Sequence, residues 1–338
     1  MPLVIVIVQV IISMFSYSLN STTFSRGILI SLFLSYSFLT IDRNIQWMDE
    51  FMLWYDSSLK SPFKARPHYN LGVTFDKNGS LEQAESEYKI AIDRDPTYYL
   101  AYENLGAVYG KKELFEEAIN YYIKALSIRP NSYIAYNNIA VIYAKTGDHD
   151  EAEKIYQHLI KNHPNNPTAY INLAELYIRK KLLEEAGRNL KKAIELAPKI
   201  FTAYYNLGQV YFMQKQFNEA ENTFKTALML NPLSGFVYHW LGQVSTEKGL
   251  FDNAIFEFKK AIELGGADSK THYNLGLLYE KKGLRNEAVK EYEYILRQYY
   301  RNCPAANDKA IPSGKENILS YYKKLLKICD KNIYDETS

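Results

Sequence analysis

Cysteine is scarce in this 338-residue chain, and the two cysteines present, Cys303 and Cys329, both lie near its C-terminal end. Two cysteines are too few for a disulfide framework, and their spacing is not that of metal-binding cysteine pairs. A single bridge between them is an open alternative in an oxidising compartment. The sequence therefore predicts a fold that depends on packing rather than on metal or multiple covalent cross-links.

An excess of charge of one sign is also absent. The chain has 40 lysine and arginine residues against 38 aspartate and glutamate residues, which gives a formal net charge of +2. Binding to nucleic-acid phosphates requires a concentrated basic surface. We therefore expect no nucleic-acid partner.

Motifs that carry chemistry are missing as well. The sequence contains no glycine-rich phosphate loop, no His-Glu-x-x-His, no nucleophile elbow and no paired-cysteine motif. The six histidines are scattered, and the glutamates next to Ala118 and Ala152 have the placement of a solvated helix face. We expect no catalysis, no metal and no small-molecule cofactor in this chain.

Internal repetition is the feature that the chain has in abundance. A small residue follows leucine or isoleucine every 34 residues, and an alanine stands twelve residues after each small residue. Seven copies without insertion or deletion predict a solenoid of helix pairs. The small residues are Gly72, Gly106, Ala140, Ala174, Gly208, Gly242 and Gly276; the alanines are Ala84, Ala118, Ala152, Ala186, Ala220, Ala254 and Ala288; the repeats are 65–98, 99–132, 133–166, 167–200, 201–234, 235–268 and 269–302.

The spacing inside one repeat predicts two helices. In the second repeat, Tyr102, Leu105, Gly106 and Tyr109 share one face of a first helix, and Ala118, Tyr122 and Ala125 share one face of a second. The two small columns are expected to face each other, as Gly208 and Ala220 would, so that the paired helices approach closely. The tyrosines are expected to fill the space between neighbouring pairs.

These columns resemble those of the tetratricopeptide repeat (TPR) family. Ser245 in the aromatic column and Gly266 in the proline column are among the few departures. The resemblance implies an all-α fold, namely a right-handed superhelix of seven helix-turn-helix repeats. It also implies a function in protein–protein interaction.

Two uncharged apolar runs, 2–17 and 27–41, precede the repeats. Each is slightly shorter than the roughly 20 residues that cross a bilayer. Extended to about 2–19 and 24–41, they predict a transmembrane hairpin over residues 1–43. The alternatives are one span at 27–41 preceded by a weaker one, or a signal peptide, although no positive charge follows Met1. The lipid bilayer is therefore an expected partner.

Residues 44–64 are predicted to form a juxtamembrane amphipathic helix. Trp47, Phe51, Trp54 and Tyr55 share one helical face, and such side chains favour the headgroup level. A cap over the first repeat is an equally open interpretation. At the other end, residues 303–338 are predicted to contain a loop, a capping helix that begins with the Ser313 and Glu316 capping box, and a polar tail.

The segment from Arg43 to Gly72 carries a second resemblance. Trp47, Asp49-Glu50, Leu53-Trp54 and Lys60-Ser61-Pro62 resemble the junction between the last membrane helix and the TPR array of O-mannosyltransferase-like membrane proteins. This resemblance implies an extracytoplasmic repeat domain, periplasmic in a bacterium. It also keeps open an alternative function, as the substrate-recognition C-terminal part of a membrane glycosyltransferase whose catalytic spans are absent from this chain.

A row of asparagines is the strongest candidate for a binding site. Six of the seven repeats carry asparagine two residues before the small residue, and the sixth carries tryptophan. An amide both donates and accepts, so such a row can bind a peptide backbone. We expect a membrane-anchored scaffold that binds extended peptide or protein partners in a groove containing Asn70, Asn104, Asn138, Asn172, Asn206, Trp240 and Asn274. Neighbours expected on the same groove include Glu103, Ile171 and His239.

Overall fold

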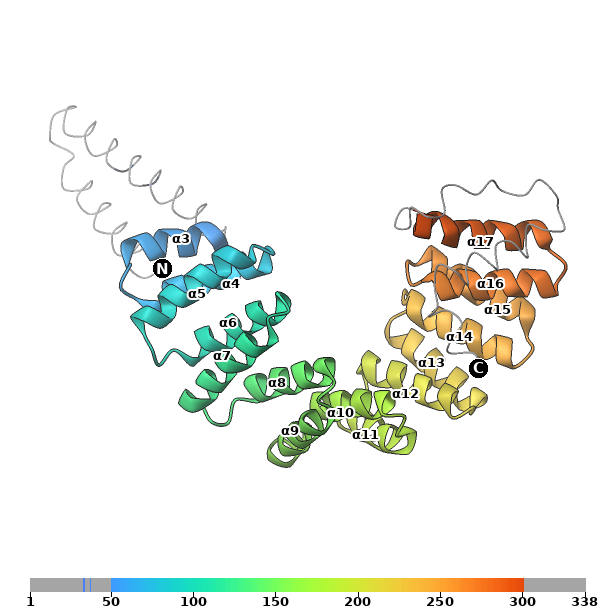
Figure 1. Cartoon of the computed structure of the whole chain (residues 1–338), viewed down its shortest axis with the longest axis horizontal. Coiled ribbons are helices and arrows are strands. Elements are labelled where there is room, and N and C mark those ends of the chain that lie inside the picture. Colours follow the sequence, from blue (N-terminus) through green and yellow to red (C-terminus); the bar gives the residue numbers. More distant parts are fainter. Residues whose placement is uncertain (1–32, 34–36, 38–49, 301–338) are drawn as a thin grey trace, which may run out of the picture. The chain divides into compact units, whose positions relative to one another are not determined.

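The computed structural model describes residues 33, 37 and 50–300, and within this part the chain forms fifteen helices (Figure 1). Apart from residues 33 and 37, the predicted membrane hairpin over 1–43 lies outside the described residues, and so does the segment 303–338. None of the described helices combines the length and the apolar character that a membrane span requires. The all-α array of helix pairs predicted from the repeats is confirmed.

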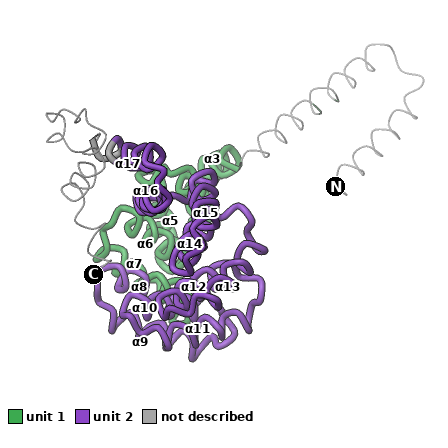
Figure 2. The backbone as a smooth tube through the Cα atoms, turned by 90° about the vertical axis from the view of Figure 1, so that its right-hand side faces the viewer, with its two compact units in different colours: residues 1–139 green, residues 140–338 purple. Residues whose placement is uncertain are grey.

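Each repeat is one helix pair. The first helices are α4 (Ala65–Lys77), α6 (Tyr99–Lys111), α8 (Tyr133–Thr146), α10 (Pro167–Arg179), α12 (Phe201–Met213), α14 (Gly235–Glu247) and α16 (Ser269–Lys281). The second helices are α5 (Leu81–Arg94), α7 (Phe115–Ile128), α9 (His149–Asn162), α11 (Leu183–Leu196), α13 (Phe217–Leu230), α15 (Phe251–Glu263) and α17 (Arg285–Tyr300). The chain divides into two compact units, residues 1–139 and 140–338 (Figure 2).

The core of each pair is a small residue set against a buried side chain of the second helix. A Cβ added to Gly106 would lie 3.0 Å from the ring of Tyr122, and one added to Gly208 would lie 2.5 Å from the ring of Phe224. This column of second-helix side chains is fully or almost fully buried in all seven repeats. It consists of Tyr88, Tyr122, Tyr156, Leu190, Phe224, Phe258 and Tyr292.

This arrangement corrects the predicted pairing of the two small columns. The nearest side chain to Gly208 is Phe224 and not Ala220. Ala220 is itself completely buried and packs in the cluster that contains Phe224 and Val237. The small residue thus provides space for a ring of its own helix pair, and the alanine lies where the following repeat stacks.

The turn between the two helices has the same backbone conformation in all seven repeats. One residue per turn has a positive φ, and these residues are 34 positions apart: Gly79, Glu113, Gly147, Lys181, Lys215, Gly249 and Gly283. Glycine adopts this left-handed region without strain, whereas other residues meet a steric penalty there. Three of the turns nevertheless have a residue other than glycine in this conformation, namely Glu113, Lys181 and Lys215, whose φ values are 58–60°.

At every second junction, successive repeats are joined by a charged contact. Glu85 of α5 accepts hydrogen bonds from Tyr109 (2.9 Å) and Lys112 (2.8 Å) of the next repeat. Glu153 accepts from Tyr177 (2.9 Å) and Lys180 (2.8 Å) in the same way.

Glu221 and Lys248 repeat this contact at 2.6 Å. At the intervening junctions of the second unit, Gly187 and Ile255 replace the glutamate. The Glu–Lys contact therefore recurs every second repeat.

The helix before the first repeat, α3 (Glu50–Lys60), packs on α4. The ring of Phe51 meets that of Phe75 edge-on at 5.4 Å, and Lys77 donates to Glu50 at 2.9 Å. This contact is what the cap interpretation of the segment requires.

The positive φ of the turns gives a test of the fold. A Cβ added at Gly249 would meet no atom within 4 Å, so the backbone conformation dominates the effect of a change there. We expect Gly249→Lys to lower the free energy of unfolding by about 1 kcal/mol, and Lys181→Gly to raise it by a similar amount. Urea denaturation followed by circular dichroism measures both. The control is Gly110→Ala, at an open position inside a helix, which should raise the free energy of unfolding. A change of the same sign and size in Gly249→Lys and Gly110→Ala would contradict the turn geometry.

The alternating contact gives a test by pH. Hydrogen bonds from Lys112, and then from Lys89, lower the pKa of Glu85 from 4.5 to about 2. A depressed carboxyl pKa stabilises the fold above the unfolded value, and this contribution is lost as the pH falls from about 4.5 towards 2. We expect Lys112→Met to raise the pKa of Glu85, measured by carbon NMR of its carboxyl group. Lys282→Met, at the equivalent position opposite Ile255, should leave it unchanged; an unaltered Glu85 midpoint in Lys112→Met would refute the contact.

Candidate functional site

The predicted asparagine row lies on the first helices, and in the first unit its amides are tied to tyrosines of the preceding repeat. The Nδ2 of Asn104 lies 3.2 Å from the hydroxyl of Tyr69 and 3.3 Å from that of Tyr88. The Nδ2 of Asn138 lies 3.1 Å from the hydroxyl of Tyr122. Asn70 is half-buried at the start of the row. These amides donate to the protein itself, so they stabilise the stacking of repeats in addition to any contact with a ligand.

The second unit contains the other four members. Asn206 is 5% exposed, and its Nδ2 donates to the exposed carboxylate of Glu175 at 2.8 Å. Trp240 donates from Nε1 to the hydroxyl of Tyr205 at 3.2 Å. Asn172 and Asn274 are half-buried. Asn206 therefore orients a carboxylate, whereas Asn172, Trp240 and Asn274 keep part of their surface accessible.

Three neighbours predicted on the groove are instead buried between repeats. Glu103 is 2% exposed and accepts a hydrogen bond from Ser132, and burial raises the pKa of its carboxyl group. Ile171 is likewise buried. Helical periodicity gives the face of each helix but not the angle at which the next repeat stacks, and this angle covers these positions.

His239, the third of these residues, belongs to a hydrogen-bonded chain. Its Nδ1 lies 2.7 Å from the hydroxyl of Thr271, which donates to Asp268 at 2.8 Å. The Nε2 of His239 lies 2.7 Å from the amide nitrogen of Gln243, which donates to it. Burial lowers the pKa of His239, so the ring is neutral at physiological pH. This part of the surface is therefore polar but uncharged.

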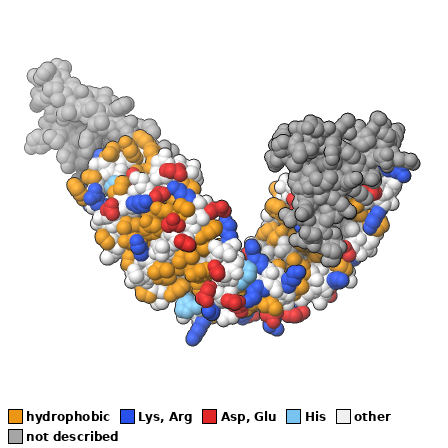
Figure 3. All heavy atoms as spheres, viewed as in Figure 1, with side chains coloured by type: hydrophobic (Ala, Val, Ile, Leu, Met, Phe, Trp, Pro, Cys, Tyr) orange, Lys and Arg blue, Asp and Glu red, His pale blue; other side chains and the backbone are white. Residues whose placement is uncertain are grey.

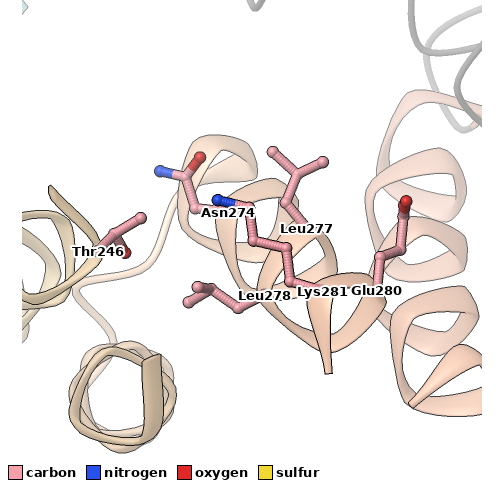
Figure 4. A pocket seen from close by; sticks show the side chains of 6 residues that line it. All are labelled: Thr246, Asn274, Leu277, Leu278, Glu280 and Lys281. Atoms are coloured by element: carbon pink, nitrogen blue, oxygen red, sulfur yellow. The ribbon is translucent and has the colours of Figure 1, made fainter. Parts of the chain in front are cut away.

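A shallow pocket of about 390 Å³ adjoins Asn274 (Figure 4). Thr246 of α14 lies on one side, and Asn274, Leu277, Leu278, Glu280 and Lys281 come from α16. The ammonium group of Lys281 reaches back to the side of Asn274, whereas Glu280 points away (Figure 4). The pocket combines an apolar floor with an amide and a cation, which is a suitable environment for an acidic or amide-bearing side chain.

Sequence reasoning missed Lys281, although its column carried a signal. The equivalent residues Lys77 and Lys111 are neutralised by Glu50 and Asp76, at 2.9 Å and 2.6 Å. Among residues 50–300, Lys281 has no carboxylate within ion-pair distance, and its ammonium lies 5.0 Å from the ring centroid of Phe251. Lysine or arginine stands seven positions after five of the seven ladder positions, and this recurrence would have identified the column.

Charged groups elsewhere on the visible face are interspersed in sign (Figure 3). In the described part of the chain, no three histidine, cysteine or acidic side chains are grouped to hold a metal ion. The described surface therefore offers the asparagines of the first helices and a small pocket that combines an apolar floor with an amide and a cation.

Comparison with known proteins bears on the repeats. Two profiles of the tetratricopeptide repeat match the chain, one at residues 98–165, 131–199 and 165–230 and the other at 65–98, 237–264 and 269–296. The sequence matches none of the curated proteins with which it was compared. None of the matches bears on the resemblance to O-mannosyltransferase-like proteins.

Several solved structures are similar to this chain. A tetratricopeptide repeat protein from Parabacteroides merdae is 18% identical with a TM-score of 0.57, over 77% of this chain and 98% of that one. The Cut9–Hcn1 structure of APC/C is 18% identical with a TM-score of 0.59, over 80% and 52%. MamA is 32% identical over 48% of this chain and 96% of its own, with a TM-score of 0.44. The first two likenesses concern the fold alone.

Proposed function

The chain belongs to the tetratricopeptide repeat family of interaction scaffolds, and from this premise we propose that it binds extended protein segments along its first helices, without catalysis of its own. The observation that carries the proposal is the accessible row of Asn172, Trp240 and Asn274 in the second unit, which ends at the pocket of Lys281. Amide side chains can bind a peptide backbone whatever its sequence.

The first unit has asparagines of its own at the equivalent positions. Asn104 and Asn138 donate their amide hydrogens to tyrosine hydroxyls. No described residue donates to the carboxamide oxygen of Asn104. This oxygen is therefore the group that would accept a backbone N–H from a ligand. The same row thus supports both the stacking of repeats and the recognition of a partner.

Replacing two accessible asparagines tests the proposal. One hydrogen bond contributes about 0.5–1.5 kcal/mol, so Asn172→Ala with Asn274→Ala should weaken binding by about 1–3 kcal/mol. Alanine favours helix more than asparagine does, so the fold should persist. The measurement is the affinity of the variant, by titration calorimetry, for peptides selected on the natural protein.

The matched control carries Asn120→Ala and Asn222→Ala, two exposed asparagines on second helices. This variant should bind like the natural protein. Equal affinity of both variants would mean that the row is only helix surface, and loss of helicity in the first variant would require the comparison to be repeated with single changes.

We further propose that residues 1–43 anchor the chain in a membrane and that the repeats lie on its extracytoplasmic side. Support comes from α3, whose face away from the first repeat is apolar and exposed. Met52, Tyr55 and Leu59 recur there at helical spacing, and Phe63 follows at 80% exposure. An exposed apolar helix face beside two predicted apolar runs fits the interfacial layer of a bilayer.

Extraction tests the anchor. The full-length protein should remain with membranes in alkaline carbonate, whereas a shortened protein beginning at Ser61 should be recovered in solution. Met52→Ser with Leu59→Ser should leave the full-length protein in the membrane fraction, because the hairpin supplies the main attachment. Release of the unaltered chain by carbonate would contradict the proposal.

A further inference from the structure

Repeat six carries two exposed large apolar side chains where the other repeats of the second unit carry polar or small ones, whereas two repeats of the first unit carry Leu100 and Ile134 at one of these positions. Phe236 is 62% exposed and Leu233 is 73% exposed, although large apolar side chains normally favour burial. In the other repeats of the second unit, the position of Phe236 is filled by Thr168, Thr202 and Lys270, and that of Leu233 by Asn165, Lys199 and Ala267. The repeat fold therefore does not require either apolar side chain.

The two exposed side chains adjoin the tryptophan that interrupts the asparagine row. Phe236 lies four residues before Trp240 on α14, so both share one helix face. The indole of Trp240 packs against the rings of Phe212 and Phe224, with ring centroids 5.3 Å and 6.2 Å apart. These contacts and the hydrogen bond to Tyr205 hold a half-buried ring beside the exposed Phe236.

A close backbone contact fixes the position of Phe236. A Cβ on Gly235 would lie 2.5 Å from the backbone nitrogen of Gly266, and a Cβ on Gly266 would lie 2.1 Å from the carbonyl carbon of Gly235. Gly266 stands where the family usually has proline. Only glycine at both positions permits this approach, which seats the first turn of α14 directly on the loop after α15.

Leu233, Phe236 and Trp240 together are called the apolar step below, and the polar and charged groups beside it restrict which ligand can bind. His239 is neutral, and its ring nitrogens are hydrogen-bonded to Thr271 and Gln243. The charged residue of α14 on the face of Trp240 is Glu247, seven residues further along the helix. On the next repeat lies the Asn274 pocket, where the ammonium of Lys281 has no acidic partner among the described residues. Trp240 and Asn274 occupy equivalent positions of α14 and α16, the two helices that line the pocket. Neighbouring helices are about 8–10 Å apart, so a ligand passes from Trp240 to Asn274 over about three residues of extended peptide.

We propose that Leu233, Phe236 and Trp240 form a specificity subsite for one apolar side chain of an extended peptide, and that the Asn274–Lys281 pocket takes an acidic side chain about three residues away. This inference rests on the proposed function, because it names the ligand of the same surface. The apolar step selects the first side chain by burial, and the unpaired cation selects the second by charge.

Selection of peptides tests the subsite. A phage-displayed library of random dodecapeptides is panned on the full-length protein in phosphatidylcholine nanodiscs, and the enriched peptides are resynthesised with acetylated and amidated ends. We expect an apolar residue and an acidic residue about three positions apart. Phe236→Ser should raise the Kd of such peptides by about tenfold or more, and Lys281→Met should remove the preference for the acidic residue.

The matched control is Phe256→Ser, which removes a phenylalanine of 58% exposure from the second helix α15 and should leave the Kd unchanged. Enriched peptides without the apolar–acidic pattern, or an unchanged Kd in Phe236→Ser, would overturn the inference while the proposed function stands. A lack of any enriched peptide would overturn the proposed function itself. If Phe256→Ser lowered the affinity as much as Phe236→Ser does, the second helices would take part in binding, and the proposed subsite would be overturned.

Discussion

Every repeat depends on one contact: a residue with little or no side chain set against a buried ring or leucine of the second helix. Gly106 lies against Tyr122 and Gly208 against Phe224 in this way. A solenoid repeat cannot bury its apolar face alone, so the outer side of each pair is covered by the next one. Where this ring is a tyrosine, its hydroxyl lies beside the first helix of the next repeat. The hydroxyls of Tyr88 and Tyr122 accept hydrogen bonds from Asn104 and Asn138 in this way. The packing therefore places the asparagine row.

The junctions between repeats are not equivalent. Glu85, Glu153 and Glu221 each accept a hydrogen bond from a lysine of the following repeat. At the junctions of Gly187 and Ile255 this glutamate is missing, and other polar contacts cross instead, from Gln214 to Glu184 and from Lys282 to Asp252. Charge-assisted hydrogen bonds are more directional than apolar contacts. This alternation divides the second unit into pairs of repeats, and it places the apolar step of repeat six and the pocket of repeat seven on two sides of a junction without such a glutamate.

The sequence was sufficient to predict the helix pairs, because two columns in register over seven copies determine which residues share a face. It was not sufficient to predict what those faces meet. Gly208 was expected opposite Ala220, but rotation of the paired helices brings it to Phe224. Glu103 and His239 were expected on the groove, yet the stacking of the next repeat covers them. The strained turn at Lys181 carries no sign in its residue type, and only comparison with Gly249 in the same column reveals it.

The central claim is that partners bind the first helices of the second unit around Trp240. The chain has three tryptophans, so fluorotryptophan labelling of the full-length protein gives three fluorine resonances, from Trp47, Trp54 and Trp240. Fluorine NMR during titration with a selected peptide follows each residue separately. The resonance that disappears in Trp240→Phe should shift in proportion to the bound fraction, while the other two stay in place. Saturating binding that leaves the Trp240 resonance unmoved would contradict the account.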